Sequence, residues 1–235
     1  MAARAVSRAA KLARIARHPT LWRPLRAGVA ASVEHLRVPF VQPGAVVDVG
    51  ASHGQFSLLA RLRFPDTPIV AFEPILAARA AFSAVLGDAV DLRPHAVGAA
   101  AGTVLMNISQ ADDSSSLLPI GQLQSEIFPG TQRAGGQVVD VVTLAGSLPF
   151  DLPTPWLVKI DVQGFELEVL RGAVPVLGKV GEIYVECSFV ELYEGQPLVD
   201  EVICFLRCHG FRLSGVFNIT SASGLPVQAD LLFRR

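Results

Sequence analysis

Short apolar runs alternate with amphipathic stretches along most of this chain. The runs contain mainly Val, Ile, Leu and Ala, and four of them are followed by a stretch whose apolar residues recur every three or four positions. Runs of this length predict buried strands, and the recurring spacing predicts helices. The predicted strands are residues 45–49, 69–72, 90–97, 103–108, 137–142, 156–160, 180–185, 212–217 and 227–233; the predicted helices are residues 55–64, 75–86, 165–171 and 198–209.

This order of elements predicts an α/β fold. Strands that alternate with helices build a doubly wound, mostly parallel sheet. The last two strands are joined by a short polar stretch without a helix, so we expect them to form a terminal antiparallel hairpin. One strand of the sheet is then reversed.

The first 40 residues differ from the rest. They hold eight Lys and Arg residues against one acid, Glu34, and residues 2–17 have the pattern of a basic amphipathic helix that Pro19 and Pro24 interrupt. We expect a helical N-terminal extension, residues 1–40, before a main domain, residues 41–235. It packs over the sheet or caps a partner in a homodimer, and its basic face is solvated. A peripheral membrane contact or a transit role is the alternative.

Composition narrows the class of protein. The 235 residues suffice for one sizeable domain, 51% are hydrophobic, and the formal net charge of −1 gives no nucleic-acid footprint. The three cysteines show no disulfide framework, which favours a reduced, cytoplasmic setting. No apolar run reaches the roughly 18 residues of a transmembrane helix.

Residues 45–74 form the most informative stretch. They predict a strand, a loop with Gly50 and Gly54, a helix, and a second strand that ends at Glu73. Glycines at such a turn let backbone or ligand approach closely, and an acid ending the second strand can accept hydrogen bonds from a ribose. D-x-G-x-x-x-G with this acid therefore indicates a nucleoside site. The alternative is a tight turn whose glycines serve packing alone.

The same spacing resembles motif I of the class I methyltransferases, which bind S-adenosylmethionine (SAM), and lacks the nicotinamide fingerprint. The resemblance implies a seven-stranded, Rossmann-like sheet. It also implies three groups of SAM-binding residues: Asp48, Gly50, Ala51, Ser52, His53 and Gly54 on the methionine side, Glu73 and Pro74 at the ribose, and Val97 at the adenine.

Acids also end two later strands, Asp161 and Glu186. Ligands of doubly wound sheets bind beyond the carboxyl ends of the strands, so both should flank the acceptor. Either could act as general base, or both could hold a divalent cation. Asp161 could instead cap the following helix. Lys159 shares a strand face with Asp161, and an ion pair is expected.

Two further segments carry candidate residues. His53 in the glycine loop is a candidate base or a polar contact without chemistry. Residues 110–136 are polar and are expected to be irregular; their Asp112, Asp113, Ser114, Ser115 and Ser116 either line a substrate pocket or form a solvated turn.

Longer segments make the resemblance more specific. The segments VVDVGASHGQFSLLA, AFEP, DDSSSL, VKIDVQGFELEVLRGA, IYVECSF and QADLLFRR together resemble the FkbM family of SAM-dependent methyltransferases over residues 44–235. The resemblance implies that Asp161, Gly164, Glu166, Ser115 and Ser116 belong to the site. Gln163 stands where the family commonly has Glu.

The resemblance implies a SAM-dependent O-methyltransferase. The expected acceptor is a hydroxyl of a small molecule, sugar, glycolipid or natural product, and no residue is assigned to a metal. The alternatives are an N- or carboxyl-methyltransferase, or a module that binds SAM or a nucleoside without catalysis.

Overall fold

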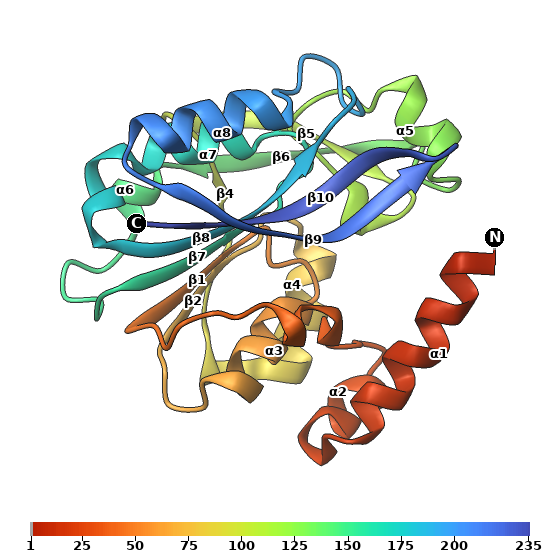
Figure 1. Ribbon diagram of the computed structural model, residues 1–235, viewed down its shortest axis with the longest axis horizontal. Helices are drawn as coiled ribbons and strands as arrows, with labels where there is room; N and C mark the ends of the chain where they lie inside the picture. Colours follow the sequence, from red (N-terminus) through yellow and green to blue (C-terminus); the bar gives the residue numbers. More distant parts are fainter. Residues whose placement is uncertain (1) are drawn as a thin grey trace.

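The computed structural model describes the backbone of residues 2–235 and the side chains of residues 9–111 and 113–235. The predicted roles of the Arg4, Arg8 and Asp112 side chains lie outside the described residues. The described chain forms a seven-stranded sheet, a three-stranded sheet and the helices around them (Figure 1).

The large sheet has the strand order β3-β2-β1-β7-β8-β10-β9. β1 pairs in parallel with β2 and β7, and β7 pairs in parallel with β8. β10 runs antiparallel to both of its neighbours. The predicted doubly wound sheet with one reversed strand is therefore confirmed. Its strands are β1 (Ala45–Val49), β2 (Ile69–Phe72), β3 (Asp91–Arg93), β7 (Trp156–Ile160), β8 (Val180–Ser188), β9 (Arg212–Ala222) and β10 (Leu225–Arg234).

Helices cover both faces of this sheet (Figure 1). α3 (Gln55–Arg63) and α4 (Leu76–Leu86) lie on one face, and α6 (Leu144–Ser147), α7 (Glu166–Ala173) and α8 (Val199–Cys208) lie on the other. Every residue of β1 is buried; Val46 packs in the α3 layer, and Val47 and Val49 pack in the α7 layer. Burial on both faces explains why the central strands are continuous apolar runs.

The small sheet was not predicted as a separate unit. It has the order β4-β6-β5 and consists of β4 (Ala96–Val97), β5 (Gly102–Ser109) and β6 (Arg133–Val142). The single strand expected at residues 90–97 is wrong, because β3 ends at Arg93 and β4 begins in the other sheet. Pro94, which lies between them, has no N–H to continue a ladder.

The stretch 110–136 is more ordered than expected. It contains the 3₁₀ helix η4 (Asp112–Ser114), α5 (Gln122–Ile127) and the first residues of β6. Thr131 is buried, and its hydroxyl donates to the carbonyl of Phe128 at 2.7 Å. Side-chain hydrogen bonds of this kind give a polar segment a fixed path that hydrophobic periodicity does not reveal.

The N-terminal segment begins with the expected helix, α1 (Ala2–Ala16), followed by η1 (Pro19–Leu21), α2 (Trp22–Arg26) and η2 (Val33–Arg37). Its later residues enter the hydrophobic core, where Val33 and Val38 are fully buried beside α3. Two short 3₁₀ helices, η3 (Gly87–Ala89) and η5 (Val174–Lys179), complete the described chain.

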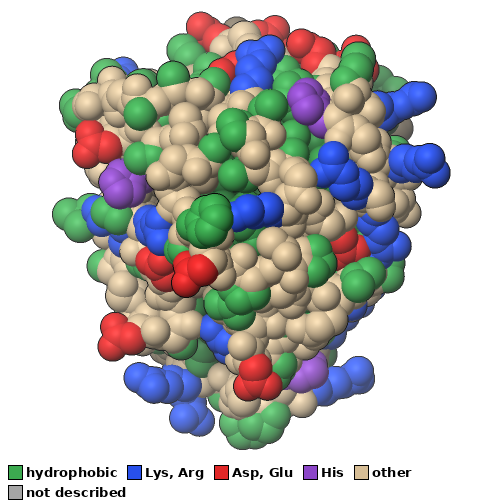
Figure 2. Space-filling view, turned by 90° about the vertical axis from the view of Figure 1, so that its left-hand side faces the viewer, with side chains coloured by type: hydrophobic (Ala, Val, Ile, Leu, Met, Phe, Trp, Pro, Cys, Tyr) green, Lys and Arg blue, Asp and Glu red, His purple; other side chains and the backbone are tan. Residues whose placement is uncertain are grey.

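Within residues 2–235, no helix combines the length and apolar character needed to cross a bilayer. On the face that carries the left-hand side of Figure 1, positive and negative side chains are interspersed with neutral and hydrophobic ones (Figure 2).

Candidate functional site

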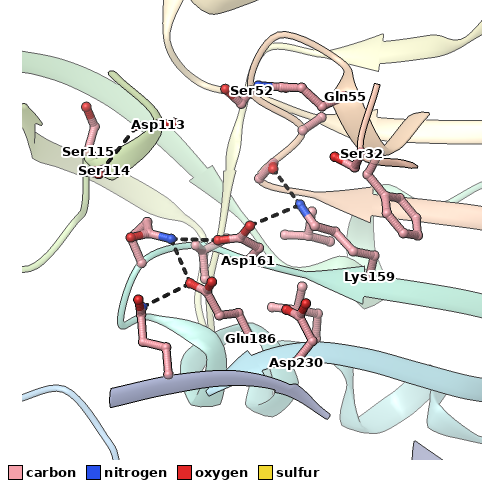
Figure 3. Close-up of a pocket in the computed structure, with 18 of the residues that line it drawn as sticks. Ser32, Ser52, Gln55, Asp113, Ser114, Ser115, Lys159, Asp161, Glu186 and Asp230 are labelled. Carbon is pink, nitrogen blue, oxygen red and sulfur yellow. Dashed lines mark hydrogen bonds and ion pairs between the residues drawn. The ribbon is translucent and has the colours of Figure 1, made fainter. Parts of the chain in front are cut away.

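A cavity of about 1230 Å³ lies at the carboxyl ends of β1, β2, β7 and β8. Its wall combines the loop after β1, the end of β2, the loop after β7, the middle of β10 and parts of the N-terminal segment. Figure 3 shows Lys159, Asp161, Glu186 and Asp230 around this space. The volume exceeds the roughly 300–1,000 Å³ of most ligand pockets.

The glycines of the β1–α3 loop are required by close packing. Gly50 has φ +76°, and a Cβ there would lie 1.9 Å from the carbonyl oxygen of Asp161. Gly54 has φ +91°, and a Cβ there would meet Phe82 and Leu86 of α4. Gly50 lines the cavity and Gly54 lies behind it. The two glycines therefore allow the loop after β7 to approach Gly50 and helix α4 to approach Gly54.

Glu73 is buried at the end of β2 and lines the cavity. Its Oε2 accepts a hydrogen bond from the backbone N–H of Ser52 at 2.8 Å, and its Oε1 accepts one from Ile75, also at 2.8 Å. Burial raises the pKa of this carboxyl, and the two backbone hydrogen bonds oppose the rise. Each oxygen keeps lone pairs for a ligand.

Lys159 lies at the centre of the site. Its ammonium donates to the carbonyl of Gly50 at 2.9 Å and lies 3.3 Å from Oδ1 of Asp48 and 3.7 Å from Oδ2 of Asp161. The expected ion pair with Asp161 is therefore present. Burial alone would lower the pKa of Lys159, but Asp48 and Asp161 raise it to about 12. Asp48 is fully buried behind the cavity wall, where Ser57 donates to its Oδ2 at 2.7 Å.

Asp161 and Glu186 come together as expected, through the side chain of Gln163. The amide nitrogen of Gln163 donates to Oδ1 of Asp161 at 2.7 Å and to Oε2 of Glu186 at 2.9 Å. Gln228 donates to the same Oε2 at 3.1 Å. The alternative that Asp161 caps α7 is not observed, since Phe165 occupies the N-cap position.

The charge of Glu186 is suppressed. Burial raises the pKa of its carboxyl well above the ordinary value, and Asp161, Asp230 and Glu166 raise it further. Asp161 is partly exposed, at 36% of its side chain, and faces the cavity. The site therefore pairs a carboxyl whose burial disfavours the ionised form with an accessible acid that forms an ion pair with Lys159.

Three residues that were predicted to bind the substrate, Gly164, Glu166 and Ser116, belong to the loop after β7 or pack against it. Oε1 of Glu166 accepts from the backbone N–H groups of Val162 and Gly164 at 3.1 and 3.0 Å, and burial raises its pKa to about 7. The hydroxyl of Ser116 donates to the carbonyl of Gln163 at 2.6 Å. Gly164, Glu166 and Ser116 do not line the cavity, so their substrate contacts stay a prediction.

Of the other predicted site residues, some line the cavity and one does not. Ala51, Ser52, Pro74, Val97 and Ser115 line the cavity. Oγ of Ser115 accepts from the backbone of Ser109 at 3.0 Å. His53 is half-buried in the glycine loop and is not among the described residues that line the cavity, so its role as a base stays a prediction.

The sequence analysis did not predict a second cluster of polar side chains on the cavity wall. It consists of His35 from η2, Tyr184 from β8, Asn218 from β9 and Asp230 from β10, and all four line the cavity. Asp230 Oδ2 accepts from Tyr184 at 3.0 Å and from Asn218 at 2.6 Å. Nδ1 of His35 lies 2.8 Å from the Tyr184 hydroxyl. Burial lowers the pKa of His35 to about 3 and raises that of Asp230 to about 6.

The basic helix α1 faces the same cavity. Lys11 and Arg14 line it, and the Lys11 ammonium lies 3.1 Å from Oε1 of Glu34. Part of the basic face of α1 thus points into the cavity. The membrane contact stays a prediction.

The described side chains offer no evident metal centre. Among residues 9–111 and 113–235, no three His, Cys, Asp or Glu side chains are grouped so that they could hold a metal ion. The charged side chains that line the cavity include the carboxyls of Glu73, Asp161, Glu186 and Asp230 and the cations Lys11, Arg14 and Lys159.

The fold is that of the class I methyltransferases. The FkbM methyltransferase from Methylobacillus flagellatus KT has a similar structure, with a TM-score of 0.53, 15% sequence identity, and coverage of 85% of this chain and 46% of that chain. A precorrin-6y C5,15-methyltransferase from Geobacter metallireducens GS-15 is 12% identical, with a TM-score of 0.47 and coverage of 87% of this chain and 86% of that chain.

The family model described as the methyltransferase FkbM domain matches residues 48–213, and the chain belongs to this family. A curated relative, Methyltransferase 1 of Beauveria bassiana (strain ARSEF 2860), is 28% identical over 154 residues, which is 57% of this chain and 60% of the relative. The match thus spans about three fifths of that relative's length.

Proposed function

We propose that this protein is a SAM-dependent O-methyltransferase whose acceptor is a hydroxyl of a small molecule, sugar, glycolipid or natural product. The observation that carries the proposal is the partly exposed Asp161, which faces the same cavity as the buried Glu73. The first can receive a proton, and the second can bind a ribose.

The residues on the cavity wall fit SAM. Glu73 keeps lone pairs for the ribose hydroxyls, and Ala96 and Val97 give an apolar surface for the adenine. Asp161 and Asp230, which also line the cavity, make the remaining wall suitable for a cationic ligand. SAM supplies an electrophilic methyl group when bound.

The chain's own residues would bind the acceptor and move its proton. A hydroxyl that attacks a methyl group must lose its proton, and we assign Asp161 to accept it because this carboxyl faces the cavity and is partly exposed. Lys159 holds Asp161 in place through the ion pair. Holding the hydroxyl in line with the bond that breaks contributes much of the rate, because both reactants then need no further orientation.

The test is methyl transfer from isotope-labelled SAM to panels of hydroxylated, amine and carboxylate acceptors, with calorimetric titration of SAM and NAD beside it. We expect micromolar SAM binding, no NAD binding and labelled ethers. Asp161→Asn should lower ether formation by about 10² or more, the usual contribution of a general base. Asp66→Asn, in an exposed turn away from the cavity, is the matched control.

Other outcomes select the alternatives. Labelled amines or esters, with activity that survives Asp161→Asn, would identify an N- or carboxyl-methyltransferase. SAM binding without transfer to any acceptor would identify a binding module. Activity that is lost with a chelator and restored by Mg²⁺ would add a divalent cation to the site.

A further inference from the structure

Gln163 occupies an unusual backbone position at the centre of the acceptor side. Its φ is +56°, in the left-handed region that favours glycine. The strain is maintained by the hydroxyl of Ser116, which donates to the Gln163 carbonyl at 2.6 Å. Strained residues of this kind persist where the surroundings fix them, and they concentrate at functional sites.

Every polar group of the Gln163 side chain is used. Its nitrogen donates one hydrogen bond to Asp161 and one to Glu186, at 2.7 and 2.9 Å. Its oxygen accepts from the Tyr193 hydroxyl at 2.8 Å. The Tyr193 hydroxyl also lies 3.1 Å from the carbonyl oxygen of Ser114. Its shorter hydrogen bond to the Gln163 oxygen favours the amide orientation in which the nitrogen points at the two acids.

We propose that Gln163 is a positioning residue that holds Asp161 and Glu186 together as one unit with a single negative charge. Two carboxyls that share one amide nitrogen are close enough to resist simultaneous ionisation. Lys159 lies 3.7 Å from Asp161, which places the charge on Asp161 and the proton on Glu186. Oε2 of Glu186 already accepts two amide hydrogen bonds, which leaves Oε1 to carry that proton.

The charged and titratable groups around Glu186 come from five elements or loops. They are Asp161 and Lys159 at β7, Glu166 on α7, Asp230 on β10, Tyr193 in the loop after β8, and Cys187 on β8 itself. Lys159 is the one cation in this set. The set therefore favours a neutral Glu186.

A glutamate at position 163 tests this arrangement. Gln163→Glu replaces the shared donor with a third carboxyl, whereas the matched control Gln228→Glu places a carboxyl against Glu186 alone. Carboxyl-carbon NMR titration of the full chain without SAM reports both acids, with assignments from Asp161→Asn and Glu186→Gln. This readout needs no acceptor and no methyl transfer.

In Gln163→Glu we expect the titration midpoints of both Asp161 and Glu186 to rise by about one pH unit or more, as for carboxyls that share a site. In Gln228→Glu the midpoint of Glu186 alone should rise. If the Asp161 midpoint is the same in Gln163→Glu as in the wild type, or if both variants move it equally, the proposal is overturned.

A milder variant decides the matter if Gln163→Glu does not fold. Tyr193→Phe keeps Gln163 but removes the hydroxyl that orients its amide, so both midpoints should move in the same direction by a smaller amount. Unchanged midpoints in a folded Tyr193→Phe would contradict the orienting role.

The catalytic consequence rests on the proposed function. In an active enzyme, Gln163→Glu should lower kcat at least tenfold at neutral pH and shift the pH profile upward, while the Kd for SAM stays within about threefold. A wild type without any transfer activity would refute the proposed function and leave the titration result standing.

Discussion

The ammonium of Lys159 lies 3.3 Å from Oδ1 of Asp48, whose side chain is completely buried. The same ammonium donates to the carbonyl of Gly50 and thereby ties β7 to the loop after β1. A buried carboxylate that loses its partner is strongly destabilising, typically by about 3–5 kcal/mol. We therefore expect Lys159→Met to lower the free energy of unfolding by that amount, measured by urea denaturation at pH 7.

The double variant Asp48→Asn with Lys159→Met separates charge from packing. If the stranded Asp48 charge causes the loss, the double variant should recover much of it, because no unpaired charge remains. Equal stabilities of the single and double variants would show that Lys159 acts through packing and its hydrogen bond to Gly50.

Glu186 should make the protein less stable as the pH rises. Burial raises the pKa of its carboxyl well above 4.5, so the folded chain keeps a proton that the unfolded chain has released. The free energy of unfolding therefore falls by about 1.4 kcal/mol per pH unit as the pH rises from about 4.5 toward the pKa of Glu186 in the folded chain.

Glu186→Gln stays neutral and should be as stable as the wild type near pH 4 and increasingly more stable toward pH 8. Denaturation curves at each pH unit measure this difference. A constant difference between the two proteins over the whole range would show that Glu186 is ionised in the fold.

His35 should have the opposite dependence. Burial lowers the pKa of His35 from 6.5 to about 3. Between pH 3 and pH 6.5, His35 is therefore protonated in the unfolded chain and neutral in the folded chain. The contribution of the neutral His35 to the free energy of unfolding is complete above pH 6.5 and is lost as the pH falls toward 3. His35→Gln cannot titrate, and its free energy of unfolding should fall less between pH 6.5 and 4. Parallel curves would contradict the buried, neutral His35.

The sequence predicted the parts of the site that follow a strand end. Glu73 and Asp161 directly follow the last residue of a buried strand, as expected. Glu186 does not end its strand, because β8 continues to Ser188, and Asp48 is the last residue but one of β1. All four lie near the carboxyl ends of parallel strands, which meet at one edge of the sheet. These runs are apolar because helices cover both faces of the sheet. The periodicity therefore defined the main sheet well.

Asp230 could not be found by that rule. It lies within β10, which runs antiparallel, and it reaches the cavity because it pairs with Glu186 in the β8–β10 register. His35 reaches the same place from a segment expected to be an extension outside the main domain. Contacts between such distant segments depend on register and packing, which a local pattern does not encode.

Gln163 illustrates a third limit. The sequence marked it only as a departure from the Glu common at this position, and the loss of a charge left the substrate and any metal open. The structure shows that the amide donates to two acids at once, which a carboxylate cannot do. The meaning of the substitution depended on partners from β8 and the loop after it.

Glu73 should dominate SAM binding on the ribose side. Glu73→Gln removes the charge and turns one accepting oxygen into a donor that faces the backbone N–H of Ser52 or Ile75. A hydrogen bond to a charged group contributes about 1.5–3 kcal/mol, so the Kd for SAM should rise about 10- to 150-fold. Calorimetric titration measures this, with Asp66→Asn as the control that should bind like the wild type. An unchanged Kd in a folded Glu73→Gln would mean that the ribose lies elsewhere in the cavity and that Glu73 serves only to join the glycine loop to α4.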